Sequence, residues 1–165
     1  MRCPACGFDN IQGTDRCKDC MEPLLHLDVP QPREGLQAHI LLDSVKEIAV
    51  FQPVTVSSSD TAARAVELMK ERRAGCVLVM DAGLVGILSE VDLLFRMPPD
   101  ADPAAVKVSQ LMTPDPETIQ EDATMAAALN RMSIGGYRHV PVIASDHTVG
   151  IISIKDLLRY LNSHL

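Results

Sequence analysis

The feature that most constrains this 165-residue chain is an internal repeat within residues 45–165. The run Gly86-Ile87-Leu88-Ser89 returns as Gly150-Ile151-Ile152-Ser153, and Val54-Thr55-Val56 matches Glu117-Thr118-Ile119 at an offset shorter by a single position. An extra residue in the second copy's hairpin loop accounts for the difference between the two offsets. A repeat of this length predicts two similar small subdomains instead of one larger domain.

Each copy is expected to fold as strand, helix, strand, strand and helix. The first helix of each copy carries apolar residues at the i, i+3, i+4, i+7 spacing of a buried face, and an apolar run such as Cys76 to Met80 is typical of a strand covered on both faces. The helix positions are Ala62, Ala65, Val66 and Met69 in the first copy and Met125, Ala128, Leu129 and Met132 in the second. We predict strands near 54–56, 76–80, 84–88, 118–120, 139–143 and 148–152, and helices near 61–72, 90–96, 124–134 and 154–163.

Composition excludes several classes of function. Hydrophobic residues make up 47% of the chain and aromatic residues 3%, so the core is built from aliphatic residues and methionine. The net charge of −7 disfavours non-specific binding to nucleic acid. The chain has no apolar run of about 18 residues and begins with cysteines, so we expect no contact with a membrane and a cytoplasmic location.

Four of the five cysteines form two CxxC pairs near the N-terminus, Cys3 with Cys6 and Cys17 with Cys20. Two such pairs can present four thiolates tetrahedrally to zinc, and a reducing compartment disfavours disulfides. Residues 1–25 therefore resemble a zinc ribbon. A closed set of four ligands favours a structural site, with a rubredoxin-like iron site that carries electrons as the alternative.

Two further expectations concern the ribbon. Gly7 follows the first pair, where a tight knuckle favours glycine, whereas Met21 stands at the matching place, so the second knuckle is expected to be less regular. Acidic residues outnumber basic residues in the ribbon, so a contact with an unidentified protein partner is favoured over nucleic acid. His26 is expected to be an exposed linker histidine and not a fifth ligand.

The composition after the ribbon marks a boundary. Pro30, Pro32 and Gly35 disfavour regular structure, and apolar residues at helical spacing follow from Leu36 to Ile48. We predict a ribbon at residues 1–25, a linker and lead-in helix at 26–44, a first repeat at 45–100 and a second at 101–165. The ribbon is expected to be tethered, with the two prolines insulating the repeats from loss of its metal.

The most specific motif occurs once in each copy: glycine, two apolar residues, serine, two variable residues and aspartate, followed by Leu-Leu. It runs from Gly86 to Asp92 and from Gly150 to Asp156. On these residues the chain resembles the CBS (cystathionine beta-synthase) domain family over residues of about 45 to 165. The resemblance implies an α/β fold, a tandem CBS-domain pair of β-α-β-β-α units, preceded by the small zinc-ribbon subdomain.

The motif also has a direct chemical interpretation. A strand ends at the serine and a helix begins, so the hydroxyl and free backbone N–H groups can hold phosphate oxygens. The aspartate one turn later can accept hydrogen bonds from ribose hydroxyls. The alternative is that Ser89 and Ser153 are ordinary N-caps and that Asp92 and Asp156 complement the helix dipole.

The resemblance implies that AMP, ADP, ATP or S-adenosylmethionine binds in clefts between the sheets of the pair. Arg138 and His139 are placed to offset ligand charge in the second copy, whereas the first copy has no cation in the matching strand, so the second site should dominate. The alternative without function for Arg138 is a surface ion pair. Cys76 lies in an apolar run with no acid or base at neighbouring positions, so it is expected to be a buried small hydrophobe and not a nucleophile. The candidate ligand residues are Thr118, Tyr137, Arg138, His139, Pro141, Ser153 and Asp156 in the second copy and Thr55, Ser89 and Asp92 in the first.

The function expected from these observations is a non-catalytic regulatory module. An adenosyl ligand changes the relative pose of the two repeats, or of two copies in a homodimer formed through residues 45–165, and so alters the surface that a partner protein contacts. The alternatives are an adaptor, with the ribbon docking a partner and the repeats as a dimerising scaffold, and the iron redox protein. No pairing of nucleophile and base is found that would favour an enzyme.

Overall fold

The computed structural model describes residues 1–11, 14–24 and 35–165, which form two compact units. Unit 1 comprises Met1–Phe51 and Thr118–Leu165, and unit 2 comprises Gln52–Glu117. The predictions made on His26, Pro30 and Pro32 lie outside the described residues. Within the described ranges, no helix has the length and apolar character needed to cross a membrane.

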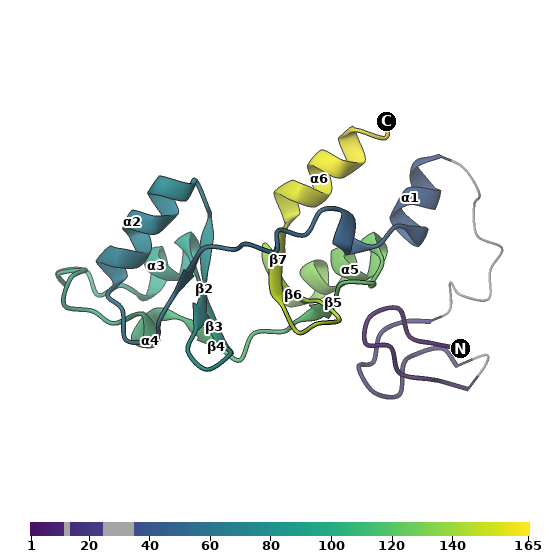
Figure 1. Ribbon diagram of the computed structural model, residues 1–165, viewed down its shortest axis with the longest axis horizontal. Coiled ribbons are helices and arrows are strands. Elements are labelled where there is room, and N and C mark those ends of the chain that lie inside the picture. The colour runs from purple at the N-terminus through teal and green to yellow at the C-terminus, as the bar shows by residue number, and fades with distance from the viewer. Residues whose placement is uncertain (12–13, 25–34) are drawn as a thin grey trace. The chain divides into compact units, whose positions relative to one another are not determined.

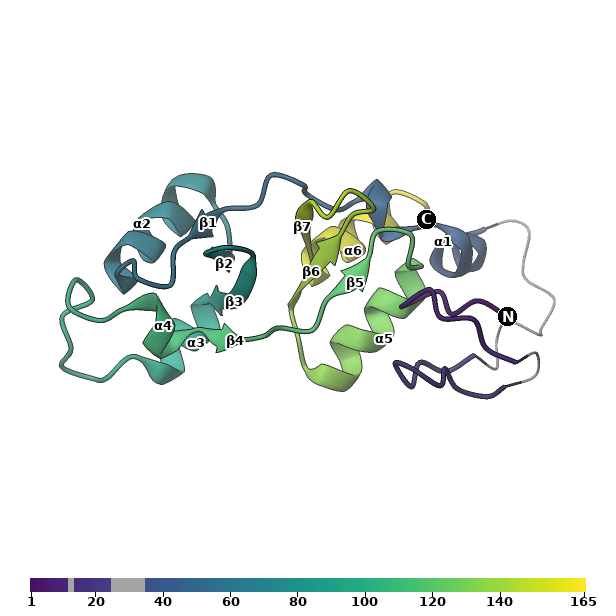
Figure 2. The same cartoon turned by 60° about the horizontal axis from the view of Figure 1, so that its bottom comes forward.

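Unit 2 holds most of the first repeat (Figure 1), built around a four-stranded sheet in the order β1-β2-β3-β4 (Figure 2). β1 is parallel to β2, and the other neighbours are antiparallel. The strand β2 is buried over Cys76 to Val79, so Cys76 lies in the core as a small hydrophobe. The elements are β1 (Thr55–Val56), α2 (Ala62–Arg72), β2 (Cys76–Met80), β3 (Leu84–Ser89), α3 (Glu90–Arg96), α4 (Val108–Leu111) and β4 (Thr113–Pro114).

Unit 1 holds the ribbon, the lead-in segment and the second repeat. Its sheet has the order β5-β6-β7, with β5 parallel to β6 and β7 antiparallel to β6 (Figure 2). The helix α1 packs against both α5 and α6. The elements are α1 (Leu36–Leu42), the 3-10 helix η2 (Val45–Glu47), β5 (Ile119–Gln120), α5 (Met125–Gly135), β6 (His139–Ile143), β7 (Val149–Ser153) and α6 (Ile154–Asn162).

The predicted elements and the repeat are confirmed. Every predicted strand and helix of the two copies is present within about one residue at each end. Val56 pairs with Val79 in the first copy and Ile119 pairs with Val142 in the second, so the offset that relates Val56 to Ile119 also relates their partners. The helices α2 and α5 also have equivalent N-caps, because the side chains of Thr61 and Thr124 each accept a hydrogen bond from the backbone N–H three residues later.

The compact units are not simply the two repeats. The segment at the start of each repeat, its lead-in, packs on the other repeat, so the two repeats exchange their lead-ins. The N–H of Val45 donates to the carbonyl of Ala123 at 2.8 Å, and the N–H of Val108 donates to the carbonyl of Asp60 at 2.8 Å. The same offset relates these two contacts, donor to donor and acceptor to acceptor. The sequence did not predict this exchange, nor the short elements α4 and β4 that belong to it.

The exchange explains the first residue of each motif. A Cβ atom on Gly86 would lie 2.6 Å from the Met112 sulfur and 3.1 Å from the Thr113 carbonyl oxygen. A Cβ atom on Gly150 would lie 2.8 Å from the ring of Phe51 and 3.1 Å from the carbonyl oxygen of Val50. Glycine is therefore needed where the lead-in segment pairs closely with the strand.

The two ribbon knuckles have matching hydrogen bonds. The N–H of Gly7 donates to the Cys3 carbonyl at 2.9 Å, and the N–H of Met21 donates to the Cys17 carbonyl at 3.0 Å. Met21 adopts a positive φ of 62°, close to the 75° of Gly7. The expectation of a less regular second knuckle is therefore wrong, and Met21 instead holds a left-handed backbone at a cost of about 1 kcal/mol.

The ribbon also packs on the second repeat within unit 1. The amide of Asn130 on α5 donates to the carboxylate of Glu22 at 3.1 Å, and Glu22 is only 7% exposed. Cys17 and Leu24 belong to the same buried cluster as Ala127 of α5. The expectation of a merely tethered ribbon is therefore wrong, because the ribbon completes its small core with residues from a helix that is distant in the sequence.

Candidate functional site

The second copy of the motif lies where β7 ends and α6 begins. The Oγ of Ser153 accepts a hydrogen bond from the N–H of Asp156 at 3.3 Å, and Oδ2 of Asp156 accepts one from the N–H of Ser153 at 3.0 Å. The Ser153 hydroxyl also donates to this carboxylate oxygen. This reciprocal capping box confirms the N-cap interpretation of Ser153 and Asp156, and it places both side chains at the positive end of the helix dipole.

The entry to β6 lies beside this helix end. His139 pairs with Ser153 across β6 and β7, and the carbonyl of Arg138 accepts a hydrogen bond from the N–H of Ile154 at 2.9 Å. Arg138 is exposed, and across the described ranges no ion pair involves its guanidinium. The structure therefore brings Arg138, His139, Ser153 and Asp156 to one end of the sheet, as the ligand-site hypothesis requires.

Of the remaining candidates of the second copy, Tyr137 precedes β6 at this end, whereas Pro141 is buried in the middle of β6. Tyr137 is 38% exposed, and its ring lies against Gly135, where a Cβ atom would be 2.1 Å from the ring. Thr118 precedes β5, and its carbonyl accepts a hydrogen bond from Arg131 at 2.8 Å. Because Ile119 pairs with Val142 in parallel strands, Thr118 lies beside Pro141, two residues or about 7 Å along the strand from His139.

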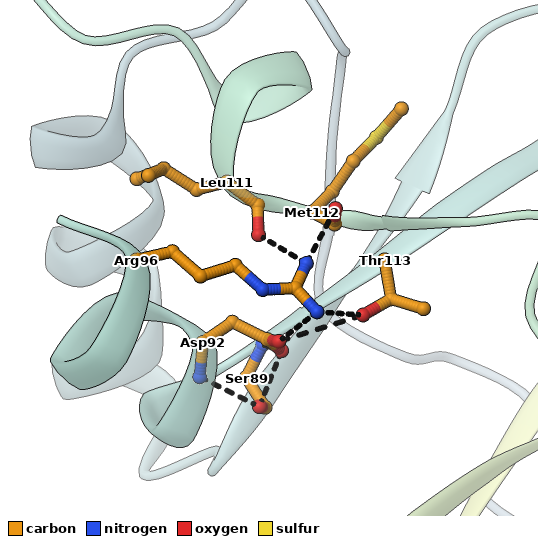
Figure 3. A network of polar contacts seen from close by, with 6 residues as sticks. All are labelled: Ser89, Asp92, Arg96, Leu111, Met112 and Thr113. Atoms are coloured by element: carbon orange, nitrogen blue, oxygen red, sulfur yellow. Dashed lines mark hydrogen bonds and ion pairs between the residues drawn. The ribbon is translucent and has the colours of Figure 1, made fainter.

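The first copy has the same capping box but a different environment (Figure 3). Asp92 binds Ser89 through Oδ2, and its Oδ1 lies 3.3 Å from the Arg96 guanidinium and 3.4 Å from the hydroxyl of Thr113. Arg96 also donates to the carbonyls of Leu111 and Met112 at 3.0 and 2.8 Å, which joins α3 to the segment before β4. Both oxygens of the first aspartate are therefore bound within the unit.

The equivalent oxygen of the second copy is less occupied. Among the described residues, Oδ1 of Asp156 is bound by Arg159, at 3.2 Å, and that arginine side chain is 78% exposed. Sequence reasoning missed Arg96, although its i, i+4 spacing from Asp92 is a signal for an ion pair on one helix face. The hydrogen bond from Thr113 to Asp92 could not be predicted from the sequence, because only the fold brings these two residues together. Thr55, the third candidate of the first copy, is exposed in β1.

The four ribbon cysteines converge on one point. Their sulfur atoms all lie within 4.8 Å of one another, with Cys3 and Cys20 at 3.6 Å and Cys6 and Cys17 at 3.5 Å. Four sulfurs bound tetrahedrally to zinc at about 2.3 Å would be separated by about 3.8 Å. The donor set and the spacing therefore fit a tetrahedral metal site.

The surroundings shift the pKa values of these thiols in opposite directions. Burial raises the pKa of the Cys6 thiol to about 11. Burial acts on Cys17 in the same direction but is outweighed by hydrogen bonds from the backbone of Cys20 and the amide of Asn10, which lower its pKa to about 6. The Asn10 amide lies 3.5 Å from the Cys17 sulfur and is fixed by the N–H of Lys18 at 2.8 Å. Cys17 is therefore the thiol most readily available as a thiolate ligand.

Comparison with known proteins agrees with this architecture. The family model described as "CBS domain" matches residues 45–98 and 108–163, so the chain belongs to the CBS domain family and carries two tandem copies. An uncharacterized 17.7 kDa protein of Acidianus ambivalens is 35% identical over 120 residues, which cover 71% of this chain and 72% of that protein.

Solved structures show the same fold. A conserved CBS domain protein of unknown function from Thermoplasma acidophilum superposes with a TM-score of 0.67 at 26% identity, covering 72% of this chain and 68% of that chain. CBSX2, crystallised in complex with AMP, has a TM-score of 0.60 at 23% identity, covering 73% of this chain and 96% of that chain. The predicted mixed α/β fold with a tandem CBS pair is therefore confirmed.

Proposed function

We propose that this protein is a non-catalytic regulatory module that binds an adenine nucleotide or S-adenosylmethionine and transmits the binding to a protein partner. The observation that carries the proposal is the end of the second sheet, where Arg138, Ser153 and Asp156 gather at the N-terminus of α6. Such an end attracts anions through the helix dipole. The similar fold of CBSX2, whose crystal contains AMP, supports this class of ligand.

Each side chain has a proposed role. Arg138 and His139 offset the charge of the phosphates, and Oδ1 of Asp156 accepts a hydrogen bond from a ribose hydroxyl. The single proton of the Ser153 hydroxyl is donated to the Asp156 carboxylate, so the proposed role of Ser153 is to hold that carboxylate in place for the ligand. Tyr137, Thr118 and Pro141 border the purine. Among the residues that the structure describes, the ribose has to displace Arg159 alone, and the exposed ion pair of that arginine contributes about 0 to 1 kcal/mol.

The two sites are proposed to be unequal, with the second dominant. In the first copy, a ribose would compete with Arg96 and Thr113 for the same oxygen of Asp92. The strand entry, Gly75 and Cys76, supplies no side-chain cation in exchange. Ser89, Asp92 and Thr55 are therefore the weaker set.

Calorimetric titration of the metal-loaded full chain with AMP, ADP, ATP and S-adenosylmethionine tests the proposal. Asp156→Ala should weaken binding about tenfold to a hundredfold, because a hydrogen bond to a charged group contributes roughly 1.5 to 3 kcal/mol. Asp92→Ala should cost less. Asp122→Ala is the matched control, because Asp122 is exposed in the turn that follows β5. The N–H of the neighbouring residue, Glu121, donates to the carbonyl of Ile143, which places this turn at the opposite end of β6 from the candidate site.

Asp156 also caps α6, so its loss can act through stability. Asp156→Asn keeps an acceptor for the Ser153 N–H while removing the charge, and thermal melting of each variant measures the cap separately. Full affinity in both Asp156 variants, or no binding of any of the four ligands by wild type, would contradict the proposal. Equal losses in Asp156→Ala and Asp92→Ala would contradict the inequality alone.

For the ribbon we propose a structural zinc ion bound by Cys3, Cys6, Cys17 and Cys20, in a cytoplasmic protein whose thiols stay reduced. When bound, zinc supplies cross-links between the two knuckles and no chemistry. Elemental analysis after purification under reducing conditions should give one zinc per chain. A coloured protein that contains iron would instead favour the redox alternative.

We further propose a homodimer formed through residues 45–165. Bound nucleotide can then change the contact between two copies of the chain as well as the pose of the repeats within one copy. A truncated chain lacking the first 35 residues is not a safe test, because the ribbon packs on α5. The association state should therefore be measured on the full chain.

A further inference from the structure

The second ribbon knuckle holds Glu22, the residue that joins the ribbon to the second repeat. The N–H of Cys17 donates to the Glu22 carbonyl at 2.7 Å, and the backbone of Glu22 also forms a hydrogen bond with the Cys20 thiol. The Glu22 carboxylate is buried and accepts a hydrogen bond from the Asn130 amide on α5 at 3.1 Å. A buried carboxylate costs free energy unless it is hydrogen-bonded, so this contact is favourable only while the knuckle keeps Glu22 in place.

The next residue of α5 holds part of the candidate ligand site. Arg131 donates to the carbonyl of Thr118 at 2.8 Å, and Thr118 immediately precedes β5. Beyond the C-cap of α5 at Gly136, the chain continues through Arg138 into β6. One helix therefore contacts the ribbon through Asn130 and fixes two segments that carry candidate ligand residues.

The ribbon and the sheet at the candidate ligand site also share one hydrophobic core. The buried cluster joins three ribbon residues to one residue from each strand of the sheet, and each strand residue adjoins a candidate ligand residue in the sequence. The ribbon residues are Cys3, Cys17 and Leu24, and the strand residues are Ile119, Val140 and Ile152, which adjoin Thr118, His139 and Ser153. Because packed interiors transmit strain, a displacement of the ribbon cysteines acts on these strands.

The first repeat, all of whose residues the structure describes, has no such pair of contacts on its matching helix. On α2 the residue that matches Asn130 is Glu67, which is exposed and pairs with Arg64 of the same helix. The residue that matches Arg131 is Leu68, which packs against the core of unit 2. The connection thus belongs to the repeat whose ligand site is proposed to be dominant.

We propose that zinc binding in the ribbon and nucleotide binding at the second repeat are coupled through α5. While the thiols are held together, the knuckle keeps Glu22 on Asn130, and α5 holds the Thr118 carbonyl and the entry to β6 in place before the nucleotide arrives. When the thiols are released, the nucleotide has to order these segments itself, which lowers its affinity. Linkage is reciprocal, so the nucleotide should tighten zinc binding by the same factor. This regulation rests on the two sites of the proposed function.

Calorimetric titration of the full chain with AMP tests the coupling, with the chain first loaded with zinc and then freed of zinc by a chelator under reducing conditions. Zinc should raise the affinity for AMP at least about fivefold, which lies within the usual range of coupling between sites. In the reverse direction, saturating AMP should raise the affinity for zinc by the same factor, measured by competition with a chelator. A ribbon that stabilises only itself would change neither affinity.

Asn130→Asp breaks the connection without altering the thiols or the candidate ligand residues, because it places a second carboxylate beside that of Glu22. The zinc-loaded variant should bind AMP at least about fivefold more weakly than wild type, and zinc should change its AMP affinity less than about twofold. Arg131→Met, which removes the hydrogen bond to Thr118 and leaves the ribbon contact, should give the same result. Glu22→Gln keeps an acceptor for the Asn130 amide and should retain the coupling, and Glu67→Gln on α2 is the matched control that should behave as wild type.

The outcomes separate this coupling from the proposed function. Equal AMP affinity in zinc-loaded and zinc-free wild type overturns the coupling and leaves the nucleotide site, whereas no AMP binding in either form overturns both the coupling and AMP as the ligand. A chain that binds no zinc overturns the coupling together with the structural zinc site. Full coupling in both Asn130→Asp and Arg131→Met overturns the route through α5. Circular dichroism and zinc content show whether each zinc-loaded variant is folded.

Discussion

The two repeats have the same backbone plan, yet their equivalent aspartates have different partners. Asp92 is held on both oxygens by Ser89, Arg96 and Thr113, whereas Asp156 leaves one oxygen to a mostly exposed arginine. The difference arises from residues outside the motif. Arg96 lies four positions after Asp92, and Thr113 lies in β4, within the lead-in of the second repeat. Similar motifs therefore do not guarantee similar sites, because the neighbours decide whether the carboxylate is available to a ligand.

The repeats also differ in what covers them. Unit 1 buries the helix face of the second repeat under α1 and packs the ribbon on α5. Unit 2 leaves Leu94 and Phe95 exposed on α3. This comparison between the two units can be tested at three levels.

The largest effect is expected from Cys17→Ser. Losing a thiolate should release the metal, whose binding contributes on the order of 10 to 16 kcal/mol apparent to such sites, and unfold the ribbon. Since Glu22 and Leu24 contact the second repeat, hydrogen exchange in α5 should rise at least tenfold while exchange in α2 stays unchanged.

Cys76→Ala is the control for metal content, because Cys76 lies in β2, outside the thiol cluster, and should leave the metal in place. If the metal is lost from Cys17→Ser and α5 exchanges as in wild type, the ribbon is a tether after all.

A smaller effect is expected from Arg96→Ala. This change removes two hydrogen bonds to backbone carbonyls and an ion pair, so unit 2 should lose about 1 to 2 kcal/mol in free energy of unfolding, measured by urea denaturation. Arg159→Ala is the matched change on α6, and it should cost less than about 0.5 kcal/mol because its ion pair is exposed. Equal costs would mean that the two aspartates are held alike.

The smallest effect concerns the ends of α2 and α5. Arg73 and Gly136 are equivalent C-caps with positive φ values of 52° and 69°. Gly136→Arg should destabilise unit 1 by about 1 kcal/mol, because a Cβ atom there meets no neighbour and only the left-handed backbone is strained. Arg73→Gly should stabilise unit 2 by a similar or smaller amount. Thermal melting of both variants measures the change in stability. Shifts of the same sign would contradict the equivalence of the two C-caps.

The sequence by itself determined the local plan of this protein. Residues that act through their near neighbours were predicted correctly, such as the helix faces around Met69 and Met132 and the convergence of the CxxC pairs. The caps at Ser89 and Ser153 were recognised from the sequence as the alternative to a ligand-binding role. Periodicity, capping and ligand spacing are short-range properties, so they can be recognised in the chain before it folds.

Only the tertiary structure decided what joins the parts. The exchange of lead-ins, the hold of Arg96 and Thr113 on Asp92, and the contact of Glu22 with Asn130 all join residues from separate elements. The regular second knuckle could not be predicted from the sequence either. Its hydrogen bonds outweigh the strain of the left-handed backbone at Met21. Contacts between distant segments depend on which surfaces are left to bury once the local elements exist, and that is a property of the packed molecule.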